Sequence, residues 1–303
     1  MDFQPTYLRL LRTGDLKKRA ELLQNQLYAC NLCPRNCGTN RIEGAVGDCG
    51  VGKYAGVSSY GPHFGEEDPL RGWQGSGTIF FSGCNLNCLY CQNSDISQNV
   101  SGKEVSEEVL AEIMLELQSR GSHNINLVSP THVSSQIVLA LYIAAQRGLD
   151  IPIVYNSGGY DSVQTLKILD GIIDIYMPDM KYSQPEVGEE LSGVPDYPYH
   201  NQIAVKEMFR QVGDLQLSSR GIAERGLLVR HLILPGNLAG SEVILNFLAG
   251  EISTETYLNI MDQYRPSYQS GRHAGMSRRI TVDEYQTAVD TALRLGITRL
   301  DKR

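Results

Sequence analysis

The stretch Thr78-Ile-Phe-Phe-Ser-Gly-Cys84-Asn-Leu-Asn-Cys88-Leu-Tyr-Cys91 decides how the rest of the chain is interpreted. Its first residues are β-branched or aromatic and predict a strand, Gly83 allows a tight turn, and three cysteines follow at once. In β/α barrels the catalytic groups sit at this position, directly after a strand. The stretch therefore predicts a first barrel strand with a reactive loop behind it.

The spacing of Cys84, Cys88 and Cys91 is C-x3-C-x2-C. One loop can then offer three thiolates to three corners of a cubane [4Fe–4S] cluster while providing no fourth cysteine. The remaining iron can hold a substrate or cosubstrate, which indicates chemistry at the cluster more than electron storage. Three buried small hydrophobes or part of a zinc site are the alternatives, and the spacing favours the cluster.

This motif resembles that of the radical S-adenosylmethionine (SAM) enzymes. The resemblance implies that the methionine amine and carboxylate of SAM bind the open iron. An electron from the cluster, supplied by a donor such as flavodoxin or ferredoxin, would then cleave the sulfonium to a 5′-deoxyadenosyl radical. It also implies an oxidoreductase-like enzyme built on a partial (β/α)6 barrel.

The composition bounds the class of protein. With 303 residues, 42% of them hydrophobic, the chain has ample material for a buried core. The formal charge of −7 gives no general electrostatic footprint for nucleic acid or an anionic membrane. No apolar run approaches the length of a membrane span and the N-terminus lacks a signal peptide, so we expect a cytoplasmic protein. All seven cysteines lie in the first third, unlike a disulfide framework.

After the cysteine loop, apolar β-rich runs alternate with amphipathic helical patterns that stop at glycines. The predicted strands are 78–81, 124–129, 151–155, 172–176, 227–234 and 254–261, and the predicted helices are 106–120, 134–147, 162–170 and 282–295. Residues 195–225 can hide a further element. We therefore predict an α/β fold, a (β/α)6 core over residues 73–265, preceded by a small Cys-rich metal-binding module over 1–72 and followed by a loop and helix over 266–303.

A second set of cysteines lies ahead of the barrel. Cys30, Cys33, Cys37 and Cys49 are spaced C-x2-C-x3-C-x11-C, which can close a tetrahedral zinc site or hold a second iron–sulfur cluster. The sequence does not choose between the two metals, and a site with four protein ligands would staple the module or pass an electron. The following residues, 60–72, are rich in turn formers and are predicted to form a surface loop, with His63 as a residue to test.

Candidate SAM-binding residues stand at the ends of the predicted strands. Pro130 is the one match to the Gly-Gly-Glu-Pro segment with which family members bind the methionine amine, so backbone carbonyls or Thr131 would take that role here. His132 can equally make a local bond at a helix start. Asn156 begins a segment whose glycines allow a ligand to approach the backbone closely, although a plain turn with a helix cap is an alternative.

Two further segments resemble the activating enzymes of pyruvate formate-lyase. Asp179-Met-Lys181 matches their Asp-x-Lys segment, which implies that Asp179 contacts a ribose hydroxyl or the amine and Lys181 the carboxylate. A solvent-exposed ion pair is the alternative. Arg230, followed by Pro235-Gly236, resembles their Arg-x-x-x-x-Pro-Gly run, and an inward-facing Arg230 would need a carboxylate partner.

The resemblance implies hydrogen abstraction from a substrate, which we expect to be a protein or peptide residue. A small molecule or a nucleic-acid base is the alternative within the enzyme class. A non-catalytic iron–sulfur or zinc protein that transfers electrons or binds a partner is the alternative outside it. A thiol oxidoreductase using Cys30 and Cys33 is disfavoured because no strand and helix flank that pair.

Overall fold

The computed structural model describes residues 3–301. Its strands are β1 (Ala55–His63), β2 (Ser76–Phe81), β3 (Lys103–Val105), β4 (Ile125–Val128), β5 (Ile153–Ser157), β6 (Ile175–Pro178), β7 (Gln216–Leu217), β8 (Ala223–Leu232) and β9 (Tyr257–Met261). Strands β2, β4, β5, β6, β8 and β9 are neighbours in that order and run parallel. The predicted core of six parallel strands is confirmed.

The sheet stays open. Strand β9 pairs with β8, and at the other end β1 runs antiparallel to β2 and is followed by β3. Strand β7 pairs antiparallel with the beginning of β8. The structure is therefore a partial barrel in which the carboxyl ends of the six parallel strands share one rim.

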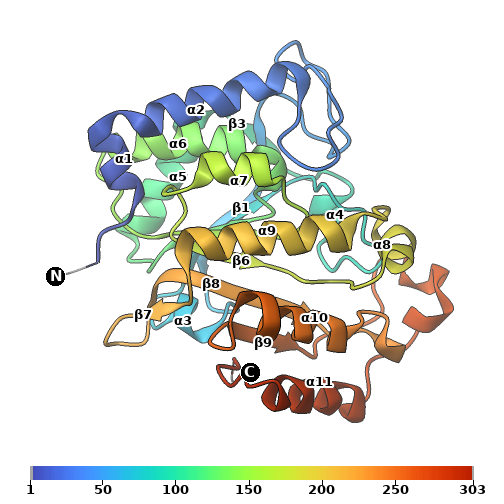
Figure 1. The fold of residues 1–303 in the computed structure, drawn as a ribbon. Helices are drawn as coiled ribbons and strands as arrows, with labels where there is room; N and C mark the ends of the chain where they lie inside the picture. Colours follow the sequence, from blue (N-terminus) through green and yellow to red (C-terminus); the bar gives the residue numbers. More distant parts are fainter. Residues whose placement is uncertain (1–2, 302–303) are drawn as a thin grey trace.

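Helices cover the outer face of the sheet (Figure 1). The helices of the described residues are α1 (Tyr7–Thr13), α2 (Asp15–Asn25), α3 (Asp68–Arg71), α4 (Ser94–Ser97), α5 (Glu107–Ser119), α6 (Ser134–Gln146), α7 (Val163–Leu169), α8 (Pro185–Ser192), α9 (Tyr197–Val212), α10 (Ser241–Phe247) and α11 (Val282–Arg294). Short 3₁₀ turns are η1 (Gln26–Ala29), η2 (Thr131–Val133), η3 (Pro235–Asn237), η5 (Ser270–Arg272) and η6 (Ala274–Met276), and η4 (Leu248–Ile252) is a π-helical turn. Helix α2 packs against α6, outside the first helical layer.

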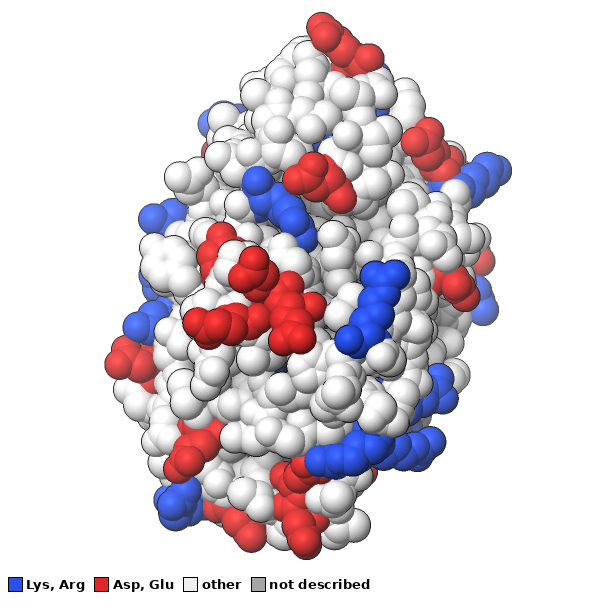
Figure 2. Space-filling view, turned by 90° about the vertical axis from the view of Figure 1, so that its right-hand side faces the viewer, with Lys and Arg blue, Asp and Glu red and all other residues white. Residues whose placement is uncertain are grey.

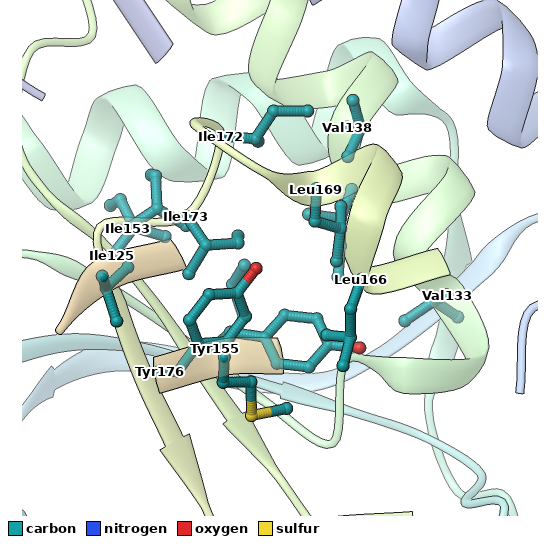
Figure 3. Packing of buried hydrophobic residues seen from close by; sticks show 14 of the residues in the cluster. Ile125, Val133, Val138, Ile153, Tyr155, Leu166, Leu169, Ile172, Ile173 and Tyr176 are labelled. Atoms are coloured by element: carbon teal, nitrogen blue, oxygen red, sulfur yellow. The ribbon is translucent and has the colours of Figure 1, made fainter. Parts of the chain in front are cut away.

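The outer core lies between the sheet and these helices. Tyr155 and Tyr176 point from β5 and β6 towards Leu166 and Leu169 of α7, as Figure 3 shows. All four side chains are almost completely buried. The same cluster continues into α1 and α2 through Tyr7 and Leu16, so the N-terminal helices share one core with the barrel.

A smaller apolar cluster fills the opposite, inner face of the sheet. Val154, Ile175 and Leu228 belong to it, and they alternate along their strands with residues of the outer core. Leu70 of α3 packs into this cluster, and Asn124 Nδ2 donates to the Leu70 carbonyl at 2.9 Å. Helix α3 thus plugs the inner face.

The structure corrects the prediction for residues 60–72. Tyr60 to His63 continue the antiparallel strand β1, and Glu66, Glu67 and Leu70 are buried, so the segment is not a surface loop. Residues 195–225 do hold further elements, α9 and β7. The predicted helices correspond to α5, α6, α7 and α11 within one or two residues at each end.

Surface charge is unevenly distributed. Figure 2 shows the face on the right-hand side of Figure 1, where acidic side chains gather near the centre and basic side chains lie apart from one another around them. Helix α8 lies on this side, and its Glu186, Glu189 and Glu190 are exposed. This face presents no continuous basic surface, which agrees with the net charge of −7.

Replacing Leu166 by alanine removes a fully buried side chain from the outer core. We expect Leu166→Ala to lower the free energy of unfolding by about 2–5 kcal/mol because the cavity left behind adds to the lost burial. Leu293→Ala is the control: Leu293 is 48% exposed on α11, and we expect a change within about 0.5 kcal/mol. Urea unfolding followed by circular dichroism measures both, and equal losses would contradict this description of the core.

Candidate active site

The three cysteines of the loop after β2 face a cavity at the shared rim of the strands. Cys84, Cys88 and Cys91 line it together with residues from the ends of four other strands, namely Ser129, Asn156, Ser157, Gly158, Asp179, Lys181 and Arg230. Gly83 begins the loop with φ +79°, and a Cβ there would collide with the Cys49 carbonyl. Only glycine tolerates both conditions.

The sulfur atoms receive hydrogen bonds that suit thiolates. The Ser192 hydroxyl donates to Cys88 Sγ at 3.0 Å, the Leu86 N–H donates to Cys84 Sγ at 3.4 Å, and Ser97 Oγ lies 3.1 Å from Cys91 Sγ. Burial raises the pKa of Cys84 to about 12, and the neighbouring Cys88 adds to the shift. A cationic metal is what keeps such a buried thiol ionised. The donor set therefore fits an iron–sulfur cluster held by three cysteines.

Asp179 is the centre of the charged part of the cavity. Lys181 Nζ donates to its Oδ2 at 2.6 Å and Arg230 Nε to its Oδ1 at 2.9 Å. Burial opposes ionisation of Asp179, but Arg230 and then Lys181 lower its pKa below the ordinary value. The predicted carboxylate partner of Arg230 is thus confirmed, and the Asp179–Lys181 pair is not solvent-exposed, since the two side chains are 13% and 15% exposed.

Asp179, Lys181 and Arg230, called the Asp179 group below, carry an excess of positive charge. Two cations against one carboxylate leave a net charge of +1, and Arg230 Nη2 is further fixed by donating to Asn156 Oδ1 at 2.9 Å. Because Lys181 has three N–H donors and only one meets Asp179, it can bind a further acceptor. This part of the cavity suits an anionic group such as a carboxylate.

Pro130 and Thr131 do not line this cavity. The Thr131 hydroxyl donates to Asp161 Oδ1 at 2.7 Å in a buried network that also contains Tyr155 and Ser157. Thr131 thus helps to hold the turn after β5. Its role towards SAM and that of Pro130 stay predictions.

His132 makes a structural bond. Its Nε2 lies 2.8 Å from the Ser82 carbonyl and ties the end of β4 to the cysteine loop. Burial lowers the pKa of His132 to about 4, so its imidazole is neutral. Among the expected cofactor residues, the structure gathers Asn156, Asp179, Lys181 and Arg230 beside the cysteines.

Sequence reasoning missed several residues of this site. Ser129 lines the cavity with the unusual φ of +59°, and Ser192 reaches Cys88 from α8, more than a hundred residues away. A serine one residue before Pro130 gave a weak signal for the first. No local pattern marks Ser192, because its role depends on the packing of α8 against the loop.

The four N-terminal cysteines also lie together. Burial raises the pKa of Cys33, with further contributions from Cys49, Cys30 and Cys37, and a Cβ on Gly47 would contact Cys37 Sγ at 3.5 Å and Cys49 Sγ at 3.6 Å. In residues 3–301, however, no group of three or more His, Cys, Asp or Glu side chains is already arranged to hold a single metal ion. A cubane needs no such common point, because its cysteines bind different iron atoms.

The fully buried Arg41 adjoins these thiols. Its Nη1 lies 3.7 Å from Cys30 Sγ and also donates to the His132 carbonyl at 2.7 Å, whereas its Nη2 has no hydrogen-bond partner. A buried guanidinium requires a compensating anion. Cysteine thiolates around a metal would supply that charge.

Comparisons with known proteins agree with this geometry. Residues 78–214 match the family described as the Radical SAM superfamily. An uncharacterised protein of Methanocaldococcus jannaschii is 30% identical over 298 residues, which cover 94% of this chain and 80% of that protein.

Within residues 3–301, no helix combines the length and apolarity needed to cross a bilayer.

Two solved structures resemble this chain over part of their length, at low identity. Streptococcus suis SuiB, bound to the precursor peptide SuiA, is 10% identical with a TM-score of 0.47, over 69% of this chain and 43% of SuiB. The FeFe-hydrogenase maturase HydG from Carboxydothermus hydrogenoformans is 17% identical with a TM-score of 0.48, over 72% of this chain and 50% of HydG. The chain spans half or less of the length of these structures.

Removing the charge of Asp179 tests the buried ion group. We expect Asp179→Asn to lower the free energy of unfolding by about 3–5 kcal/mol, since Lys181 and Arg230 lose the carboxylate that both of them contact. Asp15→Asn, which breaks the exposed pair with Lys18, is the control and should change stability far less. Urea denaturation measures both variants. Similar small effects would show that Asp179 is well solvated.

Proposed function

The chain belongs to the radical SAM superfamily, and on this premise we propose that it abstracts hydrogen from a protein or peptide residue, as the activating enzymes do whose motifs it resembles. The single observation that carries the chemistry is that one cavity contains three cysteine ligands and a cationic group. When bound, the cluster supplies the electron that cleaves SAM reductively.

Cys84, Cys88 and Cys91 hold three irons, and the hydrogen bonds from Ser192 and Leu86 stabilise the negative charge on two of the sulfurs. Lys181 binds the methionine carboxylate of SAM, with the surplus positive charge of the Asp179 group in support.

Residues at the strand ends around the cavity bind the methionine amine and the rest of the SAM molecule. Backbone carbonyls near Ser129 take the methionine amine. A Cβ on Gly158 would collide with Leu86 at 2.8 Å, so this glycine keeps the cavity wall thin and lets a ligand approach the backbone. The buried apolar side chains Leu86 and Tyr90 beside the cysteines exclude water from the reaction.

The N-terminal cysteines hold a second metal centre in this proposal, either zinc or an auxiliary iron–sulfur cluster. The buried Arg41 beside Cys30 supports an anionic site there. This centre adjoins the first, because the Cys84 N–H donates to the Cys49 carbonyl at 3.3 Å. It can therefore fix the position of the cysteine loop or pass an electron to it, with reduced flavodoxin or ferredoxin as the donor in the cytoplasm.

The production of 5′-deoxyadenosine tests the chemistry. We expect the reconstituted, dithionite-reduced protein to release it from SAM, and Cys88→Ala to reduce it to background because the cluster loses a ligand. Cys33→Ala is the matched control and should retain cleavage. Chromatography of the quenched reaction measures all three proteins. Full activity of Cys88→Ala would refute the assignment, and no product from the unaltered protein would favour a non-catalytic metal protein.

Metal counting tests the second centre. Anaerobically reconstituted protein should contain either about eight irons or about four irons and one zinc. Cys33→Ala should lose the second centre and keep about four irons. The substitution removes a ligand of the N-terminal centre and leaves Cys84, Cys88 and Cys91 intact. Elemental analysis with Mössbauer spectra decides between the metals, and an unchanged metal content in Cys33→Ala would refute the second site.

A further inference from the structure

A second chamber adjoins the cavity lined by the cysteines, and the two share Arg230. It has a volume of about 290 Å³. Its other polar wall residues are Glu66, Glu67, Asn259, Asp262 and Gln263. The chamber forms where the buried segment before α3 meets the end of β9.

The chamber is electrostatically unbalanced. Two buried carboxylates, Glu66 and Glu67, and the exposed carboxylate of Asp262 line it together with one cation, Arg230. That cation is already committed, because its Nε donates to Asp179 and its Nη2 to Asn156. The carboxylates of the chamber therefore lack a matching positive charge of their own.

Glu67 has one carboxylate oxygen with a hydrogen-bond partner and one without. Its side chain is only 4% exposed, and its Oε1 accepts a hydrogen bond from Asn259 Nδ2 at 2.8 Å. Its Oε2 is buried and has no hydrogen-bond partner. A carboxylate oxygen buried without a partner is costly, and native proteins rarely retain one unless a ligand or water satisfies it.

Glu66 adds to the demand for a cation. It is nearly as buried as Glu67 on the same wall. Burial raises the pKa of Glu66, while Arg230 lowers it. A second positive charge entering the chamber would favour the ionised form of Glu66.

We propose that this chamber binds a cationic nitrogen group of the substrate, a primary ammonium or a guanidinium, with Glu67 Oε2 as its acceptor. The inference rests on the proposed function and names the chemical class of the substrate. The group would then lie next to the cavity lined by the cysteines, because Arg230 belongs to the walls of both. A lysine or arginine side chain of a peptide and a small polyamine share this chemistry.

Calorimetric titration of the cluster-reconstituted protein with SAM tests the inference. The probes are acetyl-Gly-Lys-Gly-amide, acetyl-Gly-Arg-Gly-amide, spermidine and the neutral acetyl-Gly-norleucine-Gly-amide. We expect at least one cationic probe to bind, and the neutral probe to bind about tenfold more weakly or worse. Binding of the peptides alone assigns the group to a protein or peptide, and binding of spermidine alone to a small molecule; both outcomes support the chamber.

Glu67→Gln keeps the shape of the side chain and the bond from Asn259 but removes the charge. We expect it to weaken binding of the cationic probe about tenfold or more. Glu66→Gln serves as the second variant if Glu67→Gln does not fold, which its melting temperature shows. Glu104→Gln, an exposed substitution on β3, is the matched control and should leave affinity unchanged.

Equal affinity for the lysine and norleucine peptides, or unchanged affinity in a folded Glu67→Gln, would overturn the inference, as would no binding of any cationic probe. Release of 5′-deoxyadenosine is measured in the same preparation. If this product forms while the inference fails, the proposed function stands. If the cationic probe binds and no product forms, the proposed function fails alone.

Discussion

The buried carboxylate of Asp179 is the interaction on which the interior of this barrel depends. Asp179 directly follows β6, and its side chain binds Arg230 of β8. A backbone β-bridge also pairs these two residues, so Asp179 joins the two strands. Without Asp179, Arg230 and Lys181 would lose the carboxylate that both of them contact, and removing the partner of a buried cation costs several kcal/mol. With it, they become fixed groups on the wall between two cavities.

Helix α9, which the sequence did not predict, holds the backbone around Asp179 in place. Asn201 Nδ2 of α9 donates to the Asp179 carbonyl at 2.9 Å, and the Tyr197 hydroxyl accepts from the Lys181 N–H and donates to the Gly158 carbonyl. The ends of β5 and β6 are thus tied to one helix. Preorganisation of this kind keeps charged groups in position before any ligand arrives.

The parallel core could be predicted because most of its strands are buried on both faces and have largely apolar sequences, and a glycine often ends the helix between two strands. Strand β1 escaped prediction for the opposite reason. Its residues Ser58 to Pro62 are mostly exposed or half-buried and include a glycine and a proline, so the sequence resembles a turn-rich loop. Pairing with β2 makes it a strand, and pairing over such a distance leaves no local signal.

Some residues of the candidate site could be predicted from the sequence and others could not. Cysteine spacing is a local property and identified the ligand loop, and strand ends pointed to Asn156, Asp179, Lys181 and Arg230. The sequence did not predict Glu66 and Glu67 as site residues, because acidic residues among turn formers normally face water. The tertiary structure shows that both are buried. Their burial places two carboxylates in the wall of the second chamber, which shares Arg230 with the cavity that the cysteines line. Arg230 is therefore held among several carboxylates, since Asp179, Glu67 and Glu66 all raise its pKa.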